Sequence, residues 1–268
     1  MMTDLLLMRT ALRESLRPRR LLIATLLTLL PAGIGLTWRL LAGGKDFDPG
    51  DVYDSLVVGL VFSFSLTILS VVYGTGVVAQ ELEQRTIVYL LTRPLPRWRI
   101  LLAKFLVSLA VVAAVAVLSA LLLALAVFGP SGFTQAEVGQ DLRALLVGAL
   151  AYGSVFLLVG AALPRPLTWG LLLVFGWETW VPKLPGSFTR LSVMTYLRVL
   201  AAREVAPDAE TAAAQAGDNI LLAFARPPDL EISSQSALMI LLTVSAVALL
   251  ASLLVFSNRQ YVPREDAE

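Results

Sequence analysis

Six long runs of apolar residues alternate with shorter polar segments along this chain. A helix crosses roughly 30 Å of hydrocarbon with about 20 apolar residues. Five of the runs reach that length, and the fifth run along the chain falls short of it. The pattern therefore predicts six membrane spans, over Leu21–Ala42, Asp54–Ala79, Ile100–Phe128, Leu142–Leu163, Leu167–Val181 and Ala237–Ser257.

Prolines limit the fifth run. Pro164 and Pro166 precede it and Pro182 and Pro185 follow it, which leaves about 15 residues, or roughly 22 Å at helical rise. We expect this span to stop short of the far surface. The first run is too long for the apolar region of a signal peptide and no convincing cleavage site follows it, so we interpret it as a retained anchor.

The composition agrees with an all-α membrane protein. Hydrophobic residues make up 57% of the chain and charged residues only 15%, a balance too apolar for a soluble domain. The chain has no cysteine and no histidine, which excludes thiol nucleophiles, imidazole bases and the commonest zinc, copper and iron ligands. We therefore expect no metal site. The net charge of +1 gives no whole-chain attraction to nucleic acid.

Basic residues gather on one side of the predicted spans. The positive-inside rule places that side in the cytoplasm, so both termini are predicted to be cytoplasmic and residues 182–236 to lie outside. The loops after the first and third spans are instead acidic. The basic residues on that side are Arg9, Arg13, Arg17, Arg19, Arg20, Arg85, Arg93, Arg97, Arg99, Lys104, Arg165, Arg259 and Arg264.

The first 20 residues predict a helix that lies on the membrane surface. Leu5, Met8, Leu12 and Leu16 share one arc of such a helix, bordered by three arginines at spacing four. Arginines in this position can extend to lipid phosphates. A basic leader that only obeys the positive-inside rule is the alternative. The three arginines are Arg9, Arg13 and Arg17.

A charged segment, residues 80–99, separates the second span from the third. Its first part, "QELEQRTIVYLLT", continues as an amphipathic helix, and "RPLPR" then interrupts it because Pro94 and Pro96 disfavour helical geometry in the residues before them. Trp98 marks the membrane interface where the third span begins. Charge alone would allow an ordinary cytoplasmic loop here.

The order of residues in this segment resembles that of the ABC-2 type permeases, the membrane subunits of bacterial ABC exporters. One departure is "QRT", where "RGT" is commoner, so that an arginine stands at the usual glycine position. The resemblance is sharp over residues 81–104 and looser over the whole chain. The matching elements are Glu81 and Glu83, Arg85–Thr86, Leu90–Leu91, Thr92–Arg97 with Pro94, and Ile100–Lys104.

The resemblance implies that residues 80–99 form a coupling helix that docks into a separate ATPase subunit. It further implies that the chain pairs with a second permease, identical or similar to it. Both would lie in the bacterial cytoplasmic membrane, in contact with its lipids. Because the chain has no G-x-x-x-x-G-K-[ST] phosphate loop, we expect ATP and Mg²⁺ to be bound by the partner and this chain not to be an enzyme. The residues expected to serve coupling are Glu81, Glu83, Arg85, Thr86, Arg93 and Arg97.

Small and hydroxyl side chains follow one face of the second span at steps of three or four. Two interpretations fit this face: a lining for a substrate path at the centre of a dimer, which the resemblance favours, or close helix packing. The residues are Gly59, Ser63, Thr67, Ser70 and Gly74.

Glu178 is a carboxylate inside the fifth run, flanked by Trp177 and Trp180. A carboxylate at membrane depth is costly and often functional, which would make it part of an outer gate. Alternatively the span ends there, and Glu178 lies at the interface within a tryptophan belt. Beyond it, apolar residues from Leu191 to Leu200 alternate with arginines at helical spacing, which predicts an amphipathic outer helix or loop.

Three other functions compete with a transport permease. The sequence does not contain the motifs of an intramembrane enzyme: it has no G-x-S-x-G, no H-E-x-x-H and no paired membrane carboxylates. A secondary carrier would need broken helices in corresponding halves, which Pro31 supports only weakly. A mechanical or signalling ABC complex has the same sequence features. Lipids, amphipathic drugs, peptides or a polymer would suit the apolar path equally as substrates.

Overall fold

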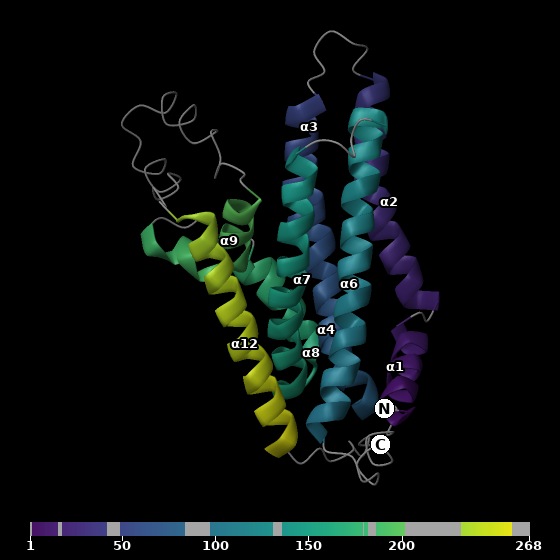
Figure 1. Cartoon of the computed structure of the whole chain (residues 1–268), viewed down its shortest axis with the longest axis vertical. Coiled ribbons are helices and arrows are strands. Elements are labelled where there is room, and N and C mark those ends of the chain that lie inside the picture. The colour runs from purple at the N-terminus through teal and green to yellow at the C-terminus, as the bar shows by residue number, and fades with distance from the viewer. Residues whose placement is uncertain are drawn as a thin grey trace.

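The computed structural model describes residues 2–15, 18–41, 49–83, 97–130, 136–178, 180–181, 186–201 and 232–258. Every regular element in these ranges is a helix. Figure 1 shows the long helices side by side in one bundle. Helix α1 (Met2–Ser15) lies at one end of this bundle and helix α3 (Pro49–Leu56) at the other. We call these the α1 end and the α3 end.

Five helical stretches of the described chain are long and apolar enough to cross a membrane. They confirm the five long runs predicted from the sequence and the all-α membrane fold. The second stretch contains three elements in line, of which the middle one, η1, is π-helical. The elements are α2 (Pro18–Leu41), α3 with η1 (Val57–Leu66) and α4 (Thr67–Glu83), α6 (Arg97–Phe128), α7 (Ala136–Ala162) and α12 (Ser234–Asn258).

The fifth run forms two short elements, α8 (Pro166–Leu172) and the π-helical η3 (Leu173–Glu178). Their 7 and 6 residues reach only about 20 Å at helical rise, so this run is too short to count as a spanning helix. The chain reverses sharply before it. Arg165 takes a left-handed conformation with φ of 55°, and Pro166 fits the first turn of α8 because its missing N–H is not needed there.

Two further short helices follow, η5 (Gly186–Leu191) and α9 (Val193–Leu200). Helix α9 lies beside α12 and nearer to the middle of the bundle than α3 does (Figure 1). Met194 and Leu197 of α9 are buried. The sequence predicted an amphipathic outer helix or loop here. The helix is present, and its apolar face packs into the bundle.

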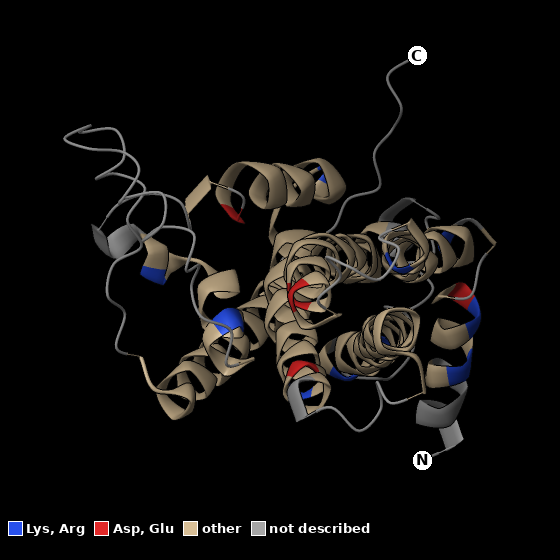
Figure 2. Cartoon of the chain, turned by 90° about the horizontal axis from the view of Figure 1, so that it is seen from above, with Lys and Arg blue, Asp and Glu red and all other residues tan. Residues whose placement is uncertain are grey.

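The N-terminal helix is shorter than the predicted helix over residues 1–20. It ends at Ser15, and α2 already begins at Pro18. A proline is accepted in the first turn of a helix but disrupts the turn before it, so Pro18 separates the two helices. End on, α1 lies at the side of the bundle with several charged residues along it, and further charged residues are scattered singly over the other ribbons (Figure 2).

Pro31 lies inside α2. Proline has no N–H to bond to the carbonyl four residues earlier, which here is that of Leu27. Two hydroxyls replace the missing donor: Ser65 Oγ donates to the Leu27 oxygen over 3.0 Å and Ser119 Oγ over 3.4 Å. Both serines are buried. The proline therefore ties α2 to η1 and α6 by way of a carbonyl that would otherwise be unpaired in an apolar region.

Helix α4 packs closely against α7 and α8 through glycines. A Cβ at Gly74 would lie 2.9 Å from Phe156 Cβ, and one at Gly160 would lie 3.0 Å from the Thr75 carbonyl oxygen. A Cβ at Gly170 of α8 would meet Val71 at 2.9 Å. Helices in lipid associate mainly by such close backbone approach. These contacts fix α4 at the centre of the bundle.

Candidate functional site

Glu178, at the end of η3, accepts four hydrogen bonds. Its Oε2 accepts from Ser192 Oγ at 2.6 Å, from Tyr152 Oη at 3.1 Å and from the Met194 amide at 3.3 Å. Its Oε1 accepts from the Val193 amide at 3.2 Å. Two hydroxyls and two backbone amides thus compensate a carboxylate that is partly withdrawn from solvent.

The network around Glu178 joins three elements. Tyr152 comes from well inside α7, and Val193 and Met194 are the first residues of α9. Ser192 is the N-cap of α9, and its side chain also accepts a hydrogen bond from the Met194 amide. The carboxylate therefore lies at the positive end of the α9 dipole and satisfies amides that have no partner within the helix.

Two more polar side chains border this network. Thr67 lies near Tyr152, and its hydroxyl donates to the Phe62 carbonyl over 3.0 Å. Arg198 of α9 lies close enough to Tyr152 to interact with it electrostatically, and burial lowers the pKa of its guanidinium. Polar side chains from α4, α7 and η3 thus lie near one another inside an apolar bundle.

A second polar cluster lies where the α1–α2 corner meets α4 and α6. Glu14 Oε2 and Lys104 Nζ form an ion pair at 3.2 Å, and Tyr73 Oη donates to the Ser15 carbonyl over 3.3 Å. The guanidinium carbon of Arg20 lies 5.3 Å from the centre of the Tyr73 ring. A small cleft of about 20 Å³ opens between these side chains. We call this cluster the polar corner.

The sequence profile of the ABC-2 family transporter proteins matches residues 16–175, which is more than half of the chain. The chain belongs to the ABC-2 family. No curated protein matches it. The resemblance noted from residues 81–104 is thereby confirmed at the level of the family. The protein is a multi-pass membrane protein and a permease subunit of an ABC transporter, and its family implies an ABC ATPase partner and typically a pair of permeases.

Half of the predicted coupling residues of this ABC-2 permease lie outside the residues that the structure describes. Arg85, Thr86 and Arg93 lie outside the described residues. Glu81 and Glu83 belong to the last turn of α4 and Arg97 begins α6, but the positions of these three side chains are outside the described part as well. Their role in coupling stays a prediction.

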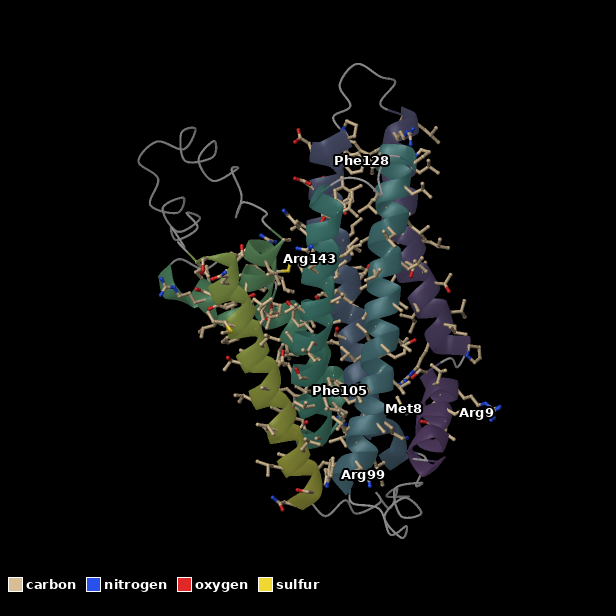
Figure 3. The ribbon with its side chains drawn as sticks, viewed as in Figure 1. Met8, Arg9, Arg99, Phe105, Phe128 and Arg143 are labelled. Atoms are coloured by element: carbon tan, nitrogen blue, oxygen red, sulfur yellow. The ribbon has the colours of Figure 1, made fainter. Side chains whose placement is uncertain are left out.

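The helices on either side of residues 84–96 pack together at their bases. Val77 and Val78 near the end of α4 form one buried cluster with Leu101 and Phe105 near the start of α6. Leu157 of α7 is among the other members of this cluster. Figure 3 shows Arg99 and Phe105 at the α1 end and Phe128 near the opposite end of α6. The two helices that flank residues 84–96 therefore have a rigid apolar base.

The predicted path residues of the second span lie in η1 and α4. Thr67 and Ser70 are buried, and Ser63 is half-buried and donates to the Val58 carbonyl over 2.8 Å. The Ser70 hydroxyl has no hydrogen-bond partner among the described residues. Phe156 of α7 occupies the space where a side chain at Gly74 would lie. Within one copy of the chain Gly74 thus serves close helix packing, and a path along this face stays a prediction.

The residues predicted to lie at the membrane interface are exposed where the structure describes them. Arg9 and Arg13 are exposed on α1, and Figure 3 shows Arg9 pointing away from the bundle. Arg17 lies outside the described residues. Trp98, Trp177 and Trp180 are exposed as well, although the Trp177 indole donates to the Leu191 carbonyl over 3.4 Å.

Sequence reasoning missed the polar corner as a unit. Lys104 was noted as part of the family pattern, yet a cation four residues into an apolar run is itself a signal that it has a partner. The partner, Glu14, is an acidic residue within a basic leader. Because 90 residues separate the two positions, only the fold could bring them together.

Proposed function

We propose that this permease is the membrane half of an exporter that a separate ATPase drives. Residues 80–99 would dock into the ATPase, which binds ATP and Mg²⁺, and would transmit its closure to α4 and α6. Two copies of the chain, or one copy and a similar permease, would enclose the path in the bacterial cytoplasmic membrane. Both termini would be cytoplasmic and residues 182–236 would lie outside.

The observation that carries this proposal is the rigid base of the two helices that flank residues 84–96. A docked segment moves a membrane helix only if the connection between them is stiff. Val77, Val78, Leu101 and Phe105 supply that stiffness by packing α4 and α6 into one cluster at the α1 end. Movement of residues 84–96 would then be passed to both helices together and, through Leu157, to α7.

Co-purification tests the ATPase partnership. The full chain, tagged and extracted from its native membrane, is expected to retain an ATPase subunit with a phosphate-binding loop. Replacing Glu81 with Lys and Glu83 with Lys should reduce both the retained ATPase and the ATP hydrolysis at least fivefold, because both changes reverse charges expected at the docking surface. The control is Asp51→Lys, which reverses the charge of an exposed acidic residue in α3. Absence of an ATPase from the unmodified complex would refute the proposal.

Transport direction is tested in membrane vesicles. In inside-out vesicles that contain the complex, the ATPase faces the external medium. When ATP is added to that medium, the vesicles should accumulate a fluorescent lipid or an amphipathic dye. Right-side-out vesicles loaded with ATP should instead release the same probe. ATP-dependent uptake into right-side-out vesicles would mean import. Hydrolysis without movement of any probe would favour a mechanical or signalling role.

A further inference from the structure

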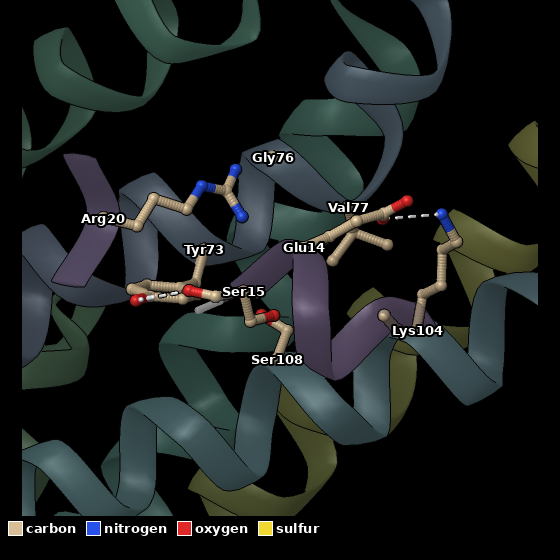
Figure 4. Close-up of a pocket in the computed structure, with 9 residues that line it drawn as sticks. Glu14, Ser15, Arg20, Tyr73, Gly76, Val77, Lys104 and Ser108 are labelled. Atoms are coloured by element: carbon tan, nitrogen blue, oxygen red, sulfur yellow. Dashed lines mark hydrogen bonds and ion pairs between the residues drawn. The ribbon is translucent and has the colours of Figure 1, made fainter. Parts of the chain in front are cut away.

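The polar corner holds α1 against both helices that flank residues 84–96. Glu14 of α1 pairs with Lys104 of α6, and Ser15 of α1 pairs with Tyr73 of α4. Figure 4 shows these side chains converging from α1, α4 and α6 on one small cleft, with Arg20 reaching in from the start of α2. A single short helix thus contacts the base of the second span and the base of the third.

The Glu14–Lys104 ion pair is well placed to hold this contact. The Lys104 side chain is 10% exposed and that of Glu14 is 30% exposed. Lys104 lies in the first turns of a membrane-spanning helix, where an unpaired ammonium group is costly. Partly buried charges are screened less than surface charges. The pair is therefore expected to persist while the helices around it move.

The Tyr73 contact strengthens the same junction. Ser15 is the last residue of α1, so its carbonyl has no partner within that helix, and the Tyr73 hydroxyl supplies one. The Arg20 guanidinium lies over the Tyr73 ring, an arrangement in which cation and ring attract. A Cβ at Gly76 would overlap the Arg20 guanidinium, so glycine at this position leaves room for it.

We propose that Glu14 and Lys104 are positioning residues that make α1 move as one body with the bases of α4 and α6. This proposal rests on the proposed function, because it assigns α1 to the moving part of an ATPase-driven permease. Helix α1 would then resist tilting of α4 and α6 relative to each other, so that docking of residues 84–96 shifts both spans together. Its lipid-facing arginines would keep this unit at the membrane surface.

Charge reversal tests the ion pair. In the complete complex in lipid nanodiscs, Glu14→Lys and Lys104→Glu should each lower ATP hydrolysis at least fivefold, because each places like charges together. The double variant E14K/K104E restores opposite charges and should recover hydrolysis to within twofold of the unmodified complex. Asp51→Lys at the opposite end of the bundle is the charge-matched control. A double variant no more active than the single variants would overturn the proposal.

A covalent link separates positioning from mere stability. The chain has no cysteine, so E14C/K104C introduces the only two thiols of the permease. This variant should hydrolyse ATP slowly, and a short bismaleimide that joins the two thiols should restore the rate at least threefold, since α1 and α6 are proposed to move together. The unmodified complex treated with the same reagent controls for thiols on the ATPase.

The outcomes distinguish the two proposals. If no ATPase accompanies the unmodified chain, the proposed function itself fails. If the ATPase is present and cross-linking lowers the rate further, then α1 and α6 must separate during the cycle, and the proposal for Glu14 and Lys104 is wrong while the proposed function stands.

Discussion

Glu178 illustrates what a single carboxylate needs in order to be stable within a helix bundle. An ionised carboxylate offers only acceptors, and every one of its four hydrogen bonds comes from a donor on a different group. Two of the donors are amides at the start of α9 that no residue of that helix can satisfy. The residue thereby fixes α9 to η3 and α7, whether or not it also serves as a gate.

Glu178→Gln is expected to lower stability by about 1–3 kcal/mol, because the amide replaces an acceptor by a donor that faces other donors. Thermal unfolding of the permease in detergent, followed by tryptophan fluorescence, measures the change. Asp51→Asn is the control, since this carboxylate is exposed on α3. An unfolding temperature equal to that of the unmodified protein would contradict the role of the carboxylate. If ATP hydrolysis falls by more than the loss of stability accounts for, the result would support a role of Glu178 in a gate.

Gly160 and Gly139 make a matched pair within α7. A Cβ at Gly160 would lie 3.0 Å from the Thr75 carbonyl oxygen and 3.1 Å from Thr75 Cα, whereas a Cβ at Gly139 would meet nothing within 4 Å. Gly160→Ala should therefore destabilise the protein by about 1–3 kcal/mol through overpacking. Gly139→Ala should be neutral or stabilising by up to about 1 kcal/mol, because alanine favours helix. Equal effects in the same unfolding assay would show that α4 and α7 are not packed as closely as this.

At the scale of elements, Pro31 and two serines depend on one another. Without Ser65 and Ser119 the Leu27 carbonyl would have no donor in an apolar region, so S65A/S119A should cost about 1–3 kcal/mol. Adding P31A supplies a backbone N–H at residue 31, which can bond to the Leu27 carbonyl in the ordinary helical way. The triple variant P31A/S65A/S119A should therefore be more stable than S65A/S119A. If P31A lowers stability further in that background, the hydroxyls do not act as replacement donors.

The long helices were predictable because their signal is local. Runs of about 20 apolar residues have no other stable use in a chain of this composition, and the five long runs were placed within a few residues of their ends, apart from the second, which α3 extends. Prolines beside residues 167–181 likewise indicated the short fifth element. The start of α2 was predicted slightly late, because Pro18 begins a helix rather than ending one.

The contacts between elements were not predictable in the same way. The pairing of Glu14 with Lys104, and of Glu178 with Ser192 and Tyr152, depends on how separate helices pack. No periodicity in the sequence records that packing. The two π-helical elements η1 and η3 were missed for a related reason: an extra residue per turn is accommodated by neighbouring helices rather than specified by residue type.

At the scale of the whole molecule, α1 and the last turn of α12 lie at one end of the bundle and α3 lies at the other (Figure 1). The basic residues around the α1 end predict that this end faces the cytoplasm. The prediction concerns the orientation of the entire bundle in the membrane. Finding either end on the opposite side of the membrane would therefore contradict it. Two exposed positions mark the ends: Asp51 in α3 and Asn258 at the close of α12.

Because the chain has no cysteine, Asp51→Cys and Asn258→Cys each give a single reactive thiol. In intact cells, a maleimide that cannot cross membranes should label Cys introduced at 51 and spare Cys introduced at 258, which should react only after the membrane is permeabilised. The unsubstituted chain is the control for background labelling. The reverse pattern would place the α1 end outside the cell, and residues 80–99 would then lie on the side without ATP. A permease oriented in that way could not be driven by a cytoplasmic ATPase, so this labelling tests the physical requirement on which the coupling mechanism depends.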